Sequence, residues 1–349
     1  MLKLLYQQDD YPIFQNRMYD SIEEAVACPK GNIRLVEDLE TGLVYNSAFC
    51  PDLMTYDGNY QNEQAISPVF QQHLEIVSTT VKRTMGQKRL VEVGCGKGYF
   101  LEMLLSKGFD VTGFDPTYEG INPKIRRQYF SADVVEQAEG IILRHVLEHI
   151  QNPIGFLEQL KVANGGNGKI YIEVPCFEWI CENRAWFDIF YEHANYFRLA
   201  DFDRMFGKVI ESGRIFGGQY IYVIAELSSL KIPKIDINSR VVFPSNFSIN
   251  FSDNKVGEKN QTVIWGGSSK GVIFSLLKSR AGYPISTVID INPAKQGKFL
   301  PGTGLQVQSP AVAIENMQKG TAVYVMNSNY LDEIKKMSGN IFRYILVEN

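Results

Sequence analysis

The sequence predicts an α/β protein with two parallel-sheet units behind a small N-terminal segment. Between residues 88 and 255, short apolar strands alternate with helical patterns, and from about residue 260 the alternation starts again. Such alternation is typical of a parallel sheet covered by helices on both faces. At 349 residues, the chain also exceeds the usual size of one domain, so two or three units are expected.

Residues 1–65 are expected to form a lid that contains a β-hairpin. The apolar runs 33–37 and 43–45 flank 38–42, a stretch rich in turn-forming residues. Ser67 and Pro68 then have the residue types of a helix N-cap and first helical position. We interpret the helix that follows as a structural connector.

The central domain is assigned to residues 66–255 and the C-terminal domain to residues 256–349. In the central domain the expected strands are 90–93, 111–114, 140–143 and 169–174, and the expected helices include 99–107 and 153–162. Residues 240–258 are interpreted as a crossover or linker. In the C-terminal domain 262–265 and 286–290 are expected strands, with a glycine-rich turn and a helix between them.

The composition is that of a globular protein and excludes several classes of function. Hydrophobic residues make up 45% of the chain and charged residues 21%, which argues against disorder and against a fibrous protein. The net charge is −4 without a long basic stripe, so no nucleic-acid partner is expected. No apolar run approaches the roughly 20 residues of a membrane span, and the start lacks signal-peptide features. Five cysteines without disulfide spacing fit a reducing cytoplasm.

A glycine-rich loop after the first central strand predicts a cofactor site. Gly94, Gly96 and Gly98 allow a tight turn and a close approach of the backbone to a ligand. The helix behind them begins with unpaired N–H groups. The spacing G-x-G-x-G differs from the dinucleotide motif G-x-G-x-x-G, whose third glycine comes one residue later.

Acidic residues around this loop indicate which cofactor binds. Glu92 precedes the loop, where a carboxylate repels phosphate but pairs with an ammonium group. Asp115 ends the second strand, where it can accept hydrogen bonds from ribose, and Asp133 is placed for an adenine amine. This arrangement favours S-adenosylmethionine over NAD; the alternative is a Rossmann-like domain that binds nothing. Two neighbours complete the predicted cofactor site: Pro116 and Arg144.

Three of the four histidines follow strands of the central unit. His145 and His149 come directly after the strand at 140–143, and His193 follows the strand at 169–174. Ligands of open α/β sheets bind outside the carboxyl ends of the strands, so these histidines should face the cofactor. His73 lies on the connector helix and is expected to have a surface or packing role.

Methyl transfer to carbon needs a base that removes a proton beside a carbonyl, and a donor that stabilises the enolate oxygen. Histidine suits the first role, and tyrosine or neutral histidine suits the second. Tyr191, Glu192 and His193 provide a hydroxyl, a carboxylate and a base within three residues. In the alternative interpretation, Glu148 and His149 cap a helix while Tyr191 and His193 are buried and hydrogen-bonded.

At this point the sequence resembles the three-part sugar C-methyltransferases, which methylate carbon 3 of nucleotide-linked 4-keto deoxysugars in pathways such as mycarose biosynthesis. The resemblance extends over most of the chain. The segments that carry it are 59–68, 93–98, 114–120, 144–150, 191–197, 216–220, 265–271, 290–302 and 329–334. It implies a class I methyltransferase Rossmann-like domain, a second Rossmann-like C-terminal domain and an N-terminal lid.

The resemblance also implies roles for individual residues. His193 would be the base, with Tyr191, Glu192 and His149 as its active-site neighbours. Tyr60, or else Tyr56, would close over the site from the lid. The C-terminal domain would help to hold the substrate, which the resemblance implies is a sugar nucleotide. Two further substrate-binding residues are assigned: His145, and Lys270 as a candidate phosphate contact or a solvated helix start.

Two features depart from the family. Members usually carry two Cys-x-x-Cys pairs near the N-terminus that bind a structural zinc, whereas here Cys28 and Cys50 are isolated. We therefore predict no metal, and a lid that depends on packing of Tyr11, Ile13, Phe14, Ile33 and Val44. Gly304 also stands where the family would have a histidine.

Two other functions stay open at this stage. The same scaffold would serve an O- or N-methyltransferase that acts on another small metabolite or glycan precursor. A non-catalytic S-adenosylmethionine-binding protein is the third hypothesis, which the intact loop and histidine cluster disfavour. The acceptor atom, the nucleotide base and the oligomeric state leave no recognisable motif.

Overall fold

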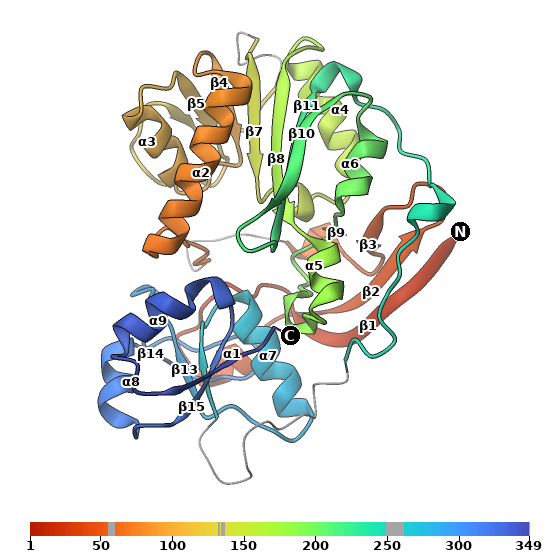
Figure 1. Ribbon diagram of the computed structural model, residues 1–349. Coiled ribbons are helices and arrows are strands. Elements are labelled where there is room, and N and C mark those ends of the chain that lie inside the picture. Colours follow the sequence, from red (N-terminus) through yellow and green to blue (C-terminus); the bar gives the residue numbers. More distant parts are fainter. Residues whose placement is uncertain (55–59, 132, 134–136, 249–261, 349) are drawn as a thin grey trace.

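The computed structural model describes residues 1–54, 60–131, 133, 137–248 and 262–348. Within these ranges the strands form three sheets, of four, seven and five strands. Figure 1 shows the seven-stranded sheet above the five-stranded one, with the N-terminal strands beside them. The predicted α/β fold class, with two parallel-sheet units, is confirmed.

The four-stranded sheet has the order β1-β2-β3-β9. β2 (Lys30–Asp38) and β3 (Val44–Asn46) pair antiparallel around the predicted turn, so the hairpin is confirmed. β1 (Leu2–Pro12) pairs with the other edge of β2; its sequence does not predict a strand, because two register shifts interrupt its alternation. β9 (Asn195–Tyr196) comes from the central part of the chain. Residues 1–65 therefore do not form the lid sheet alone.

The apolar side chains of the lid pack as the sequence predicts, in a core that they share with the other two units. The five expected side chains are all buried: Tyr11, Ile13, Phe14, Ile33 and Val44. The expected linker also packs here, because Phe247 meets the ring of Tyr6 edge-on at 5.2 Å. The described part of the expected linker, residues 240–248, thus covers the lid, and the rest of it lies outside the described residues.

The seven-stranded sheet has the order β10-β11-β8-β7-β4-β5-β6. Five strands are parallel: β4 (Leu90–Val93), β5 (Val111–Phe114), β6 (Ile125–Arg126), β7 (Gly140–Arg144) and β8 (Lys169–Pro175). β10 (Val209–Ile215) and β11 (Tyr220–Glu226) add an antiparallel edge. The four strands predicted for this unit are confirmed.

Helices cover both faces of this sheet, as its alternating buried side chains require. On one face α2 (Pro68–Met85) and α3 (Tyr99–Ser106) share a core with Leu90 and Ile142. On the other face the core contains Val91 together with α4 (Pro153–Ala163) and α6 (Leu199–Met205). Shorter helices lie in the lid and the connections: α1 (Ile22–Val26), α5 (Phe177–Glu182), and the 3-10 turns 51–53, 147–149, 186–188, 227–229 and 237–239.

The connector helix begins as predicted. Ser67 is its N-cap, whose Oγ accepts a hydrogen bond from the backbone N–H of Phe70 at 3.4 Å, and Pro68 is its first residue. The same hydroxyl donates to Glu333 Oε2 of the C-terminal unit at 2.5 Å. The start of α2 is therefore tied to both units.

The C-terminal sheet is parallel throughout, with the order β14-β13-β12-β15-β16. Its strands are β12 (Val263–Trp265), β13 (Thr287–Ile289), β14 (Val307–Gln308), β15 (Ala322–Val325) and β16 (Arg343–Leu346). Its helices are α7 (Ser269–Arg280), α8 (Pro310–Asn316) and α9 (Leu331–Met337), preceded by the 3-10 turn 328–330. None of the described helices is long and apolar enough to cross a membrane.

The two Rossmann-like units meet through aromatic packing. Phe274 of α7 stacks on Trp186 with 5.3 Å between ring centroids, and meets Phe187 edge-on at 6.2 Å. All three rings are almost fully buried. Ring pairs of this kind contribute stabilisation beyond the area they bury.

We expect Phe274→Ala to lower the free energy of unfolding by about 3–5 kcal/mol, because it opens a cavity at this contact. Urea denaturation followed by tryptophan fluorescence measures the effect. Phe274→Leu is the control, since it keeps most of the apolar volume and should lose clearly less. A loss below about 1 kcal/mol for the alanine variant would mean that the contact between the units is not tightly packed.

Candidate active site

The glycine-rich loop between β4 and α3 has the backbone that the sequence predicts. Gly94, Gly96 and Gly98 have φ angles of 73°, 54° and 84°, in the left-handed region that favours glycine. A Cβ at Gly94 would also lie 2.4 Å from Val146, and one at Gly98 would lie 2.5 Å from Ile125. Side chains are therefore excluded at the first and third glycines by space as well as by backbone conformation.

The two predicted acids beside this loop differ in the hydrogen bonding of their carboxylates. Glu92 is buried, and its Oε2 has no hydrogen-bond partner among the described residues. Burial raises the pKa of Glu92 to about 7, against the opposing charge of Arg144. Asp115 is engaged: its Oδ2 accepts from the N–H of Gly96 at 2.8 Å, and its Oδ1 accepts from Thr117. Glu92 is thus the acid that still needs a cation.

The outer cofactor residues lie at the surface. Pro116 follows Asp115 and is exposed, and Asp133 is an exposed turn residue. Arg144 has a different environment, because its guanidinium lies 4.7 Å above the ring of Phe100 and contacts Glu173 at 3.2 Å. The structure therefore places Arg144 inside the central unit, close enough for its charge to act on Glu92.

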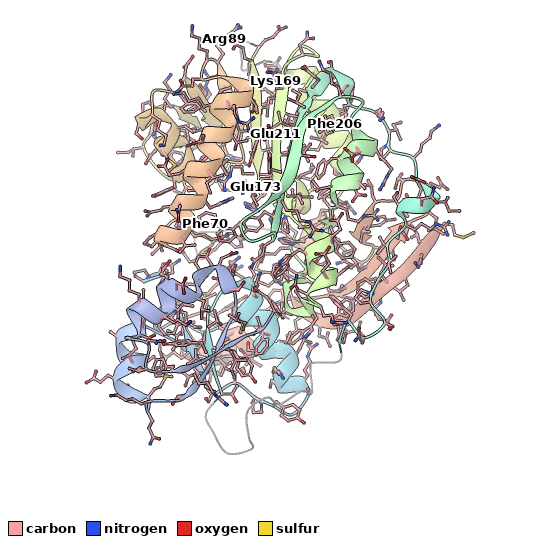
Figure 2. The ribbon with its side chains drawn as sticks, viewed as in Figure 1. Phe70, Arg89, Lys169, Glu173, Phe206 and Glu211 are labelled. Atoms are coloured by element: carbon pink, nitrogen blue, oxygen red, sulfur yellow. The ribbon has the colours of Figure 1, made fainter. Side chains whose placement is uncertain are left out.

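A buried charge cluster lies behind the site, centred on Glu173 of β8. Its carboxylate contacts Arg144, His145 Nε2 at 3.0 Å and His73 Nε2 at 3.0 Å, and accepts from the Tyr171 hydroxyl at 2.7 Å. Figure 2 shows Glu173 in the half of the central unit nearer the C-terminal unit. For His73, the packing role is the one that the structure supports.

His145 is held by two carboxylates. Its Nε2 contacts Glu173, and its Nδ1 contacts Glu148 at 3.3 Å. Burial alone would lower the pKa of His145, but the two carboxylates outweigh burial and raise it to about 9. The residue also has a φ of 52°, which is uncommon for a side chain other than glycine. His145 is therefore a positively charged, constrained start of the segment that carries His149.

His149 and His193 lie together, as predicted, with 5.1 Å between ring centroids. His149 Nδ1 lies 2.8 Å from the carbonyl oxygen of Glu192; since a carbonyl only accepts, Nδ1 carries the proton and Nε2 presents its lone pair. His193 is buried, and its Nδ1 has no partner among the described residues. Burial lowers the pKa of His193 to about 3, so this ring is neutral.

Glu192 joins the lid to this pair. Its Oε1 accepts from the backbone N–H of Gln15 at 2.6 Å, and its Oε2 accepts from the Tyr60 hydroxyl at 2.6 Å. Tyr60 thus reaches the site from the lid, as predicted, while Tyr56 lies outside the described residues. Tyr191 is not brought to the site: its hydroxyl accepts from the backbone N–H of Cys50 at 3.0 Å, inside the lid.

Residues of the lid, the central unit and the C-terminal unit line one pocket. Three parts of the chain line it: the lid with Asn16 and Tyr60, the central unit with His145, Glu148, His149, Glu192, His193 and Tyr220, and the C-terminal unit with Ser268, Ser269, Lys270, Asn292 and Lys295. Lys270, the predicted phosphate contact, pairs with Asp188 at 3.1 Å and lies 4.7 Å above the ring of Trp179. Its charge is therefore already compensated.

One group of side chains in the described part of the chain has the geometry of a metal site. Glu148, His149 and His193 have ligand-type atoms within 4.8 Å of one another. This group is in the pocket, whereas the family's structural zinc would lie near Cys28 and Cys50. The prediction of no structural zinc rests on the sequence alone.

Sequence reasoning missed several pocket and core residues. Glu148, Asn292 and Lys295 line the pocket, and Glu173 supports it from behind. Glu173 had a usable signal, because it is an acid inside the apolar run of β8, as Glu92 is in β4. The other three lie in loops and turns, where no periodic pattern indicates the direction of a side chain.

Comparison with known proteins gives the class. Residues 63–209 match the family model described as a methyltransferase domain. No curated protein matches the chain. The plantazolicin methyltransferase BpumL, solved with a triazolic desmethylPZN analog and SAH, is 16% identical over 46% of this chain and 85% of that one, with a TM-score of 0.36.

Two further solved structures are similar over comparable spans. A SAM-dependent methyltransferase from Archaeoglobus fulgidus is 17% identical over 47% of this chain and 100% of that one, with a TM-score of 0.32. The Burkholderia thailandensis 1,6-didemethyltoxoflavin-N1-methyltransferase is 13% identical over 57% of this chain and 98% of that one, with a TM-score of 0.36.

The matched residues run from the segment before α2 to the first residue of β10, and include the glycine loop, Glu92, Asp115 and the three pocket histidines. The chain therefore contains a methyltransferase domain and is an enzyme of the transferase class. Its methyl donor is S-adenosylmethionine, for which the unpaired acid beside the glycine loop is suited.

The charge of His145 should appear in the pH dependence of stability. Its pKa is about 9 in the folded chain against 6.5 as the ordinary value, so its stabilisation is complete below pH 6.5 and disappears as the pH rises through 9. We expect the free energy of unfolding to fall by up to about 3 kcal/mol over this window. Urea denaturation across the window tests this, with His145→Gln as the comparison. Equal slopes in both proteins would contradict the assignment.

Proposed function

We propose that the protein transfers the methyl group of S-adenosylmethionine to a carbon atom of a nucleotide-linked keto deoxysugar. The observation that carries the proposal is the pocket itself. The His149–His193 pair and the glycine-rich start of α7 both line it, so a base and a second loop can contact the same ligand. The acceptor class follows from the family resemblance, and the two sets of lining groups support a small molecule with two chemically different ends.

In this proposal S-adenosylmethionine supplies the methyl group as a sulfonium. Glu92 pairs with its ammonium group, because Glu92 is the buried acid without a partner beside the loop. Asp115 holds the loop through Gly96 and keeps free lone pairs for ribose. Asp133 contacts the adenine amine, and Arg144 tunes the charge of Glu92 from inside the unit.

His193 removes the proton beside the ketone. Its ring lines the pocket and its Nδ1 has no partner among the described residues, although burial lowers its pKa to about 3 and so weakens it as a base in the free protein. His149 is a second candidate for the base, since its Nδ1–H is fixed on the Glu192 carbonyl and its Nε2 is free to accept. Tyr191 lies in the lid, so we propose that the pocket residue Tyr220 takes over its role as hydroxyl donor to the enolate oxygen.

The five cysteines are all unpaired in the structure, which supports the cytoplasmic setting expected from the sequence. The substrate is accordingly proposed to be a small cytoplasmic metabolite. An O- or N-methyl transfer on the same scaffold is the competing function, and it differs in one observable: only the enolate route exchanges the α-hydrogen of the substrate with solvent.

Mass spectrometry in deuterated buffer tests the reaction. The enzyme is incubated with S-adenosylmethionine and a panel of nucleotide-linked 4-keto deoxysugars. We expect a gain of one methyl with loss of the α-hydrogen, and a fall of at least about 100-fold in rate for the base variant, in line with the contribution of general-base catalysis.

His193→Asn and His149→Asn, made separately, identify which ring is the base. The base variant should lose both exchange and methylation, while the other should retain exchange. Methylation without exchange of the α-hydrogen would instead indicate O- or N-methylation, and no methylated sugar at all would refute the sugar assignment.

Cofactor affinity should depend on Glu92. With its pKa near 7 in the free protein, this carboxyl is uncharged at lower pH and cannot pair with an ammonium group. The dissociation constant of S-adenosylmethionine, measured by calorimetry, should therefore rise about tenfold per pH unit from pH 7 down to 5. Glu92→Gln should bind weakly with a flat profile, and Glu119→Gln, on an exposed loop, should keep the wild-type profile. An unchanged profile in Glu92→Gln would refute the role.

A further inference from the structure

The two Rossmann-like units build their first loop with the same contacts. In the central unit, the N–H of Gly94 donates to the Phe114 carbonyl at 2.8 Å, and the N–H of Gly96 donates to Asp115 Oδ2 at 2.8 Å. In the C-terminal unit, the N–H of Gly266 donates to the Ile289 carbonyl at 2.7 Å. There the N–H of Gly267 donates to the carboxylate of Asp290, the residue after β13, at 2.8 Å. The second loop is thus shaped like the ligand loop of the first.

One buried side chain beside each loop differs in the sign of its charge. Two residues before Gly94 the central strand carries Glu92, whereas two residues before Gly266 the C-terminal strand carries the apolar Ile264. Next to the second loop lies a lysine instead, because Lys295 donates to the hydroxyl of Ser268, the N-cap of α7. A loop with an unpaired acid suits an ammonium group, and a loop with a lysine suits an anion.

Lys295 is a buried cation without an acid. Its side chain is 2% exposed, and no carboxylate in the described residues lies within 4.0 Å of its amine. Burial lowers the pKa of Lys295, while the more distant Asp290 and Glu192 oppose this. Burying an ammonium group in this way is costly unless a counter-ion joins it. The residue lines the pocket, so a ligand can supply that counter-ion.

A second donor in the same place has no partner. Asn292 is 5% exposed, its Oδ1 accepts from the N–H of Ala294, and its Nδ2 has no acceptor among the described residues. Asn292 lines the pocket beside Lys295 and Ser268. The N-terminus of α7, a helix of 12 residues, adds free N–H groups and the positive end of its dipole.

Lys270 is the other lysine at this helix, and it differs in one respect. Its amine pairs with Asp188 and also donates to Gln219 Oε1 at 3.0 Å. Its charge is therefore compensated within the chain, and it connects the two units rather than awaiting a ligand. The two lysines make a matched pair for experiment.

We propose that Lys295, the amide of Asn292 and the N-terminus of α7 bind a phosphate or diphosphate group of the substrate. This inference rests on the proposed function, in which the sugar end of the same molecule reaches the histidine pair. A glycine-rich loop at a helix start is a suitable phosphate cradle because several N–H groups converge on one anion. Lys295 adds the charge, and Asn292 adds a donor that fixes orientation.

Calorimetry with the full chain and without S-adenosylmethionine tests the anion site directly. Inorganic phosphate, inorganic pyrophosphate and a nucleoside diphosphate serve as separate probes. We expect pyrophosphate and the nucleoside diphosphate to bind, and the dissociation constant to rise at least tenfold in Lys295→Met. Free phosphate that binds more tightly than either diphosphate would overturn the assignment to a substrate group.

Control variants separate this site from general charge effects. Lys270→Met and Lys298→Met, which lose equal charge nearby, should bind pyrophosphate within about threefold of wild type. Asn292→Asp keeps the shape of the side chain and puts a carboxylate at the unpaired donor, so it should abolish binding even if Lys295→Met fails to fold. Equal weakening in Lys270→Met and Lys295→Met, or unchanged binding in Asn292→Asp, would overturn the proposal.

The two proposals can fail separately. If pyrophosphate binds through Lys295 but no keto sugar is methylated, the anion site stands and the proposed reaction falls. If a nucleotide-linked keto sugar is methylated with the same KM by wild type and Lys295→Met, the reaction stands and the anion site is refuted.

Discussion

The buried carboxylate of Glu173 is the interaction on which the active site depends most. It is fully buried, and it meets Arg144, His145, His73 and the Tyr171 hydroxyl at once. A buried charge is tolerated only when it is paired and hydrogen-bonded, and removing one partner leaves the others uncompensated. Adjacent sheet strands and α2 are therefore joined by a contact that a neutral residue could not supply.

The same cluster sets the position of both chemical groups of the central unit. On one side, the positive charge of Arg144 lowers the pKa of Glu92, which lies beside the cofactor loop. On the other side, His145 begins the turn that carries His149 into the pocket, and its left-handed backbone is held by its two carboxylate contacts. Strain of this kind persists only where the surroundings fix the residue. The methyl-donor side and the base side are thus supported by one charge cluster.

The sequence was sufficient for what is local and periodic. Alternating apolar strands predicted the central sheet, Ser67 and Pro68 predicted the start of α2, and the glycine loop predicted backbone conformations that only glycine adopts readily. The sequence was insufficient in irregular segments, where no periodic pattern fixes the direction of a side chain. Tyr191 and His193 are two residues apart in an irregular segment, yet one faces the lid and the other the pocket. Lys270 and Lys295 look alike in sequence, and only tertiary contacts show which one is compensated.

The arrangement of the two units restricts what the pocket can hold. A ligand that bound only to the histidine pair would leave the Lys295 amine buried without a counter-ion. A ligand that bound only at the start of α7 would leave the histidine pair without a substrate. Because both sets of groups line one pocket, we propose that a single molecule with a neutral reactive end and an anionic end occupies it. The first loop and the second loop share their aspartate contact but differ in the sign of a neighbouring buried charge, and in our proposal this difference places the ammonium-bearing donor in one unit and the anionic substrate in the other.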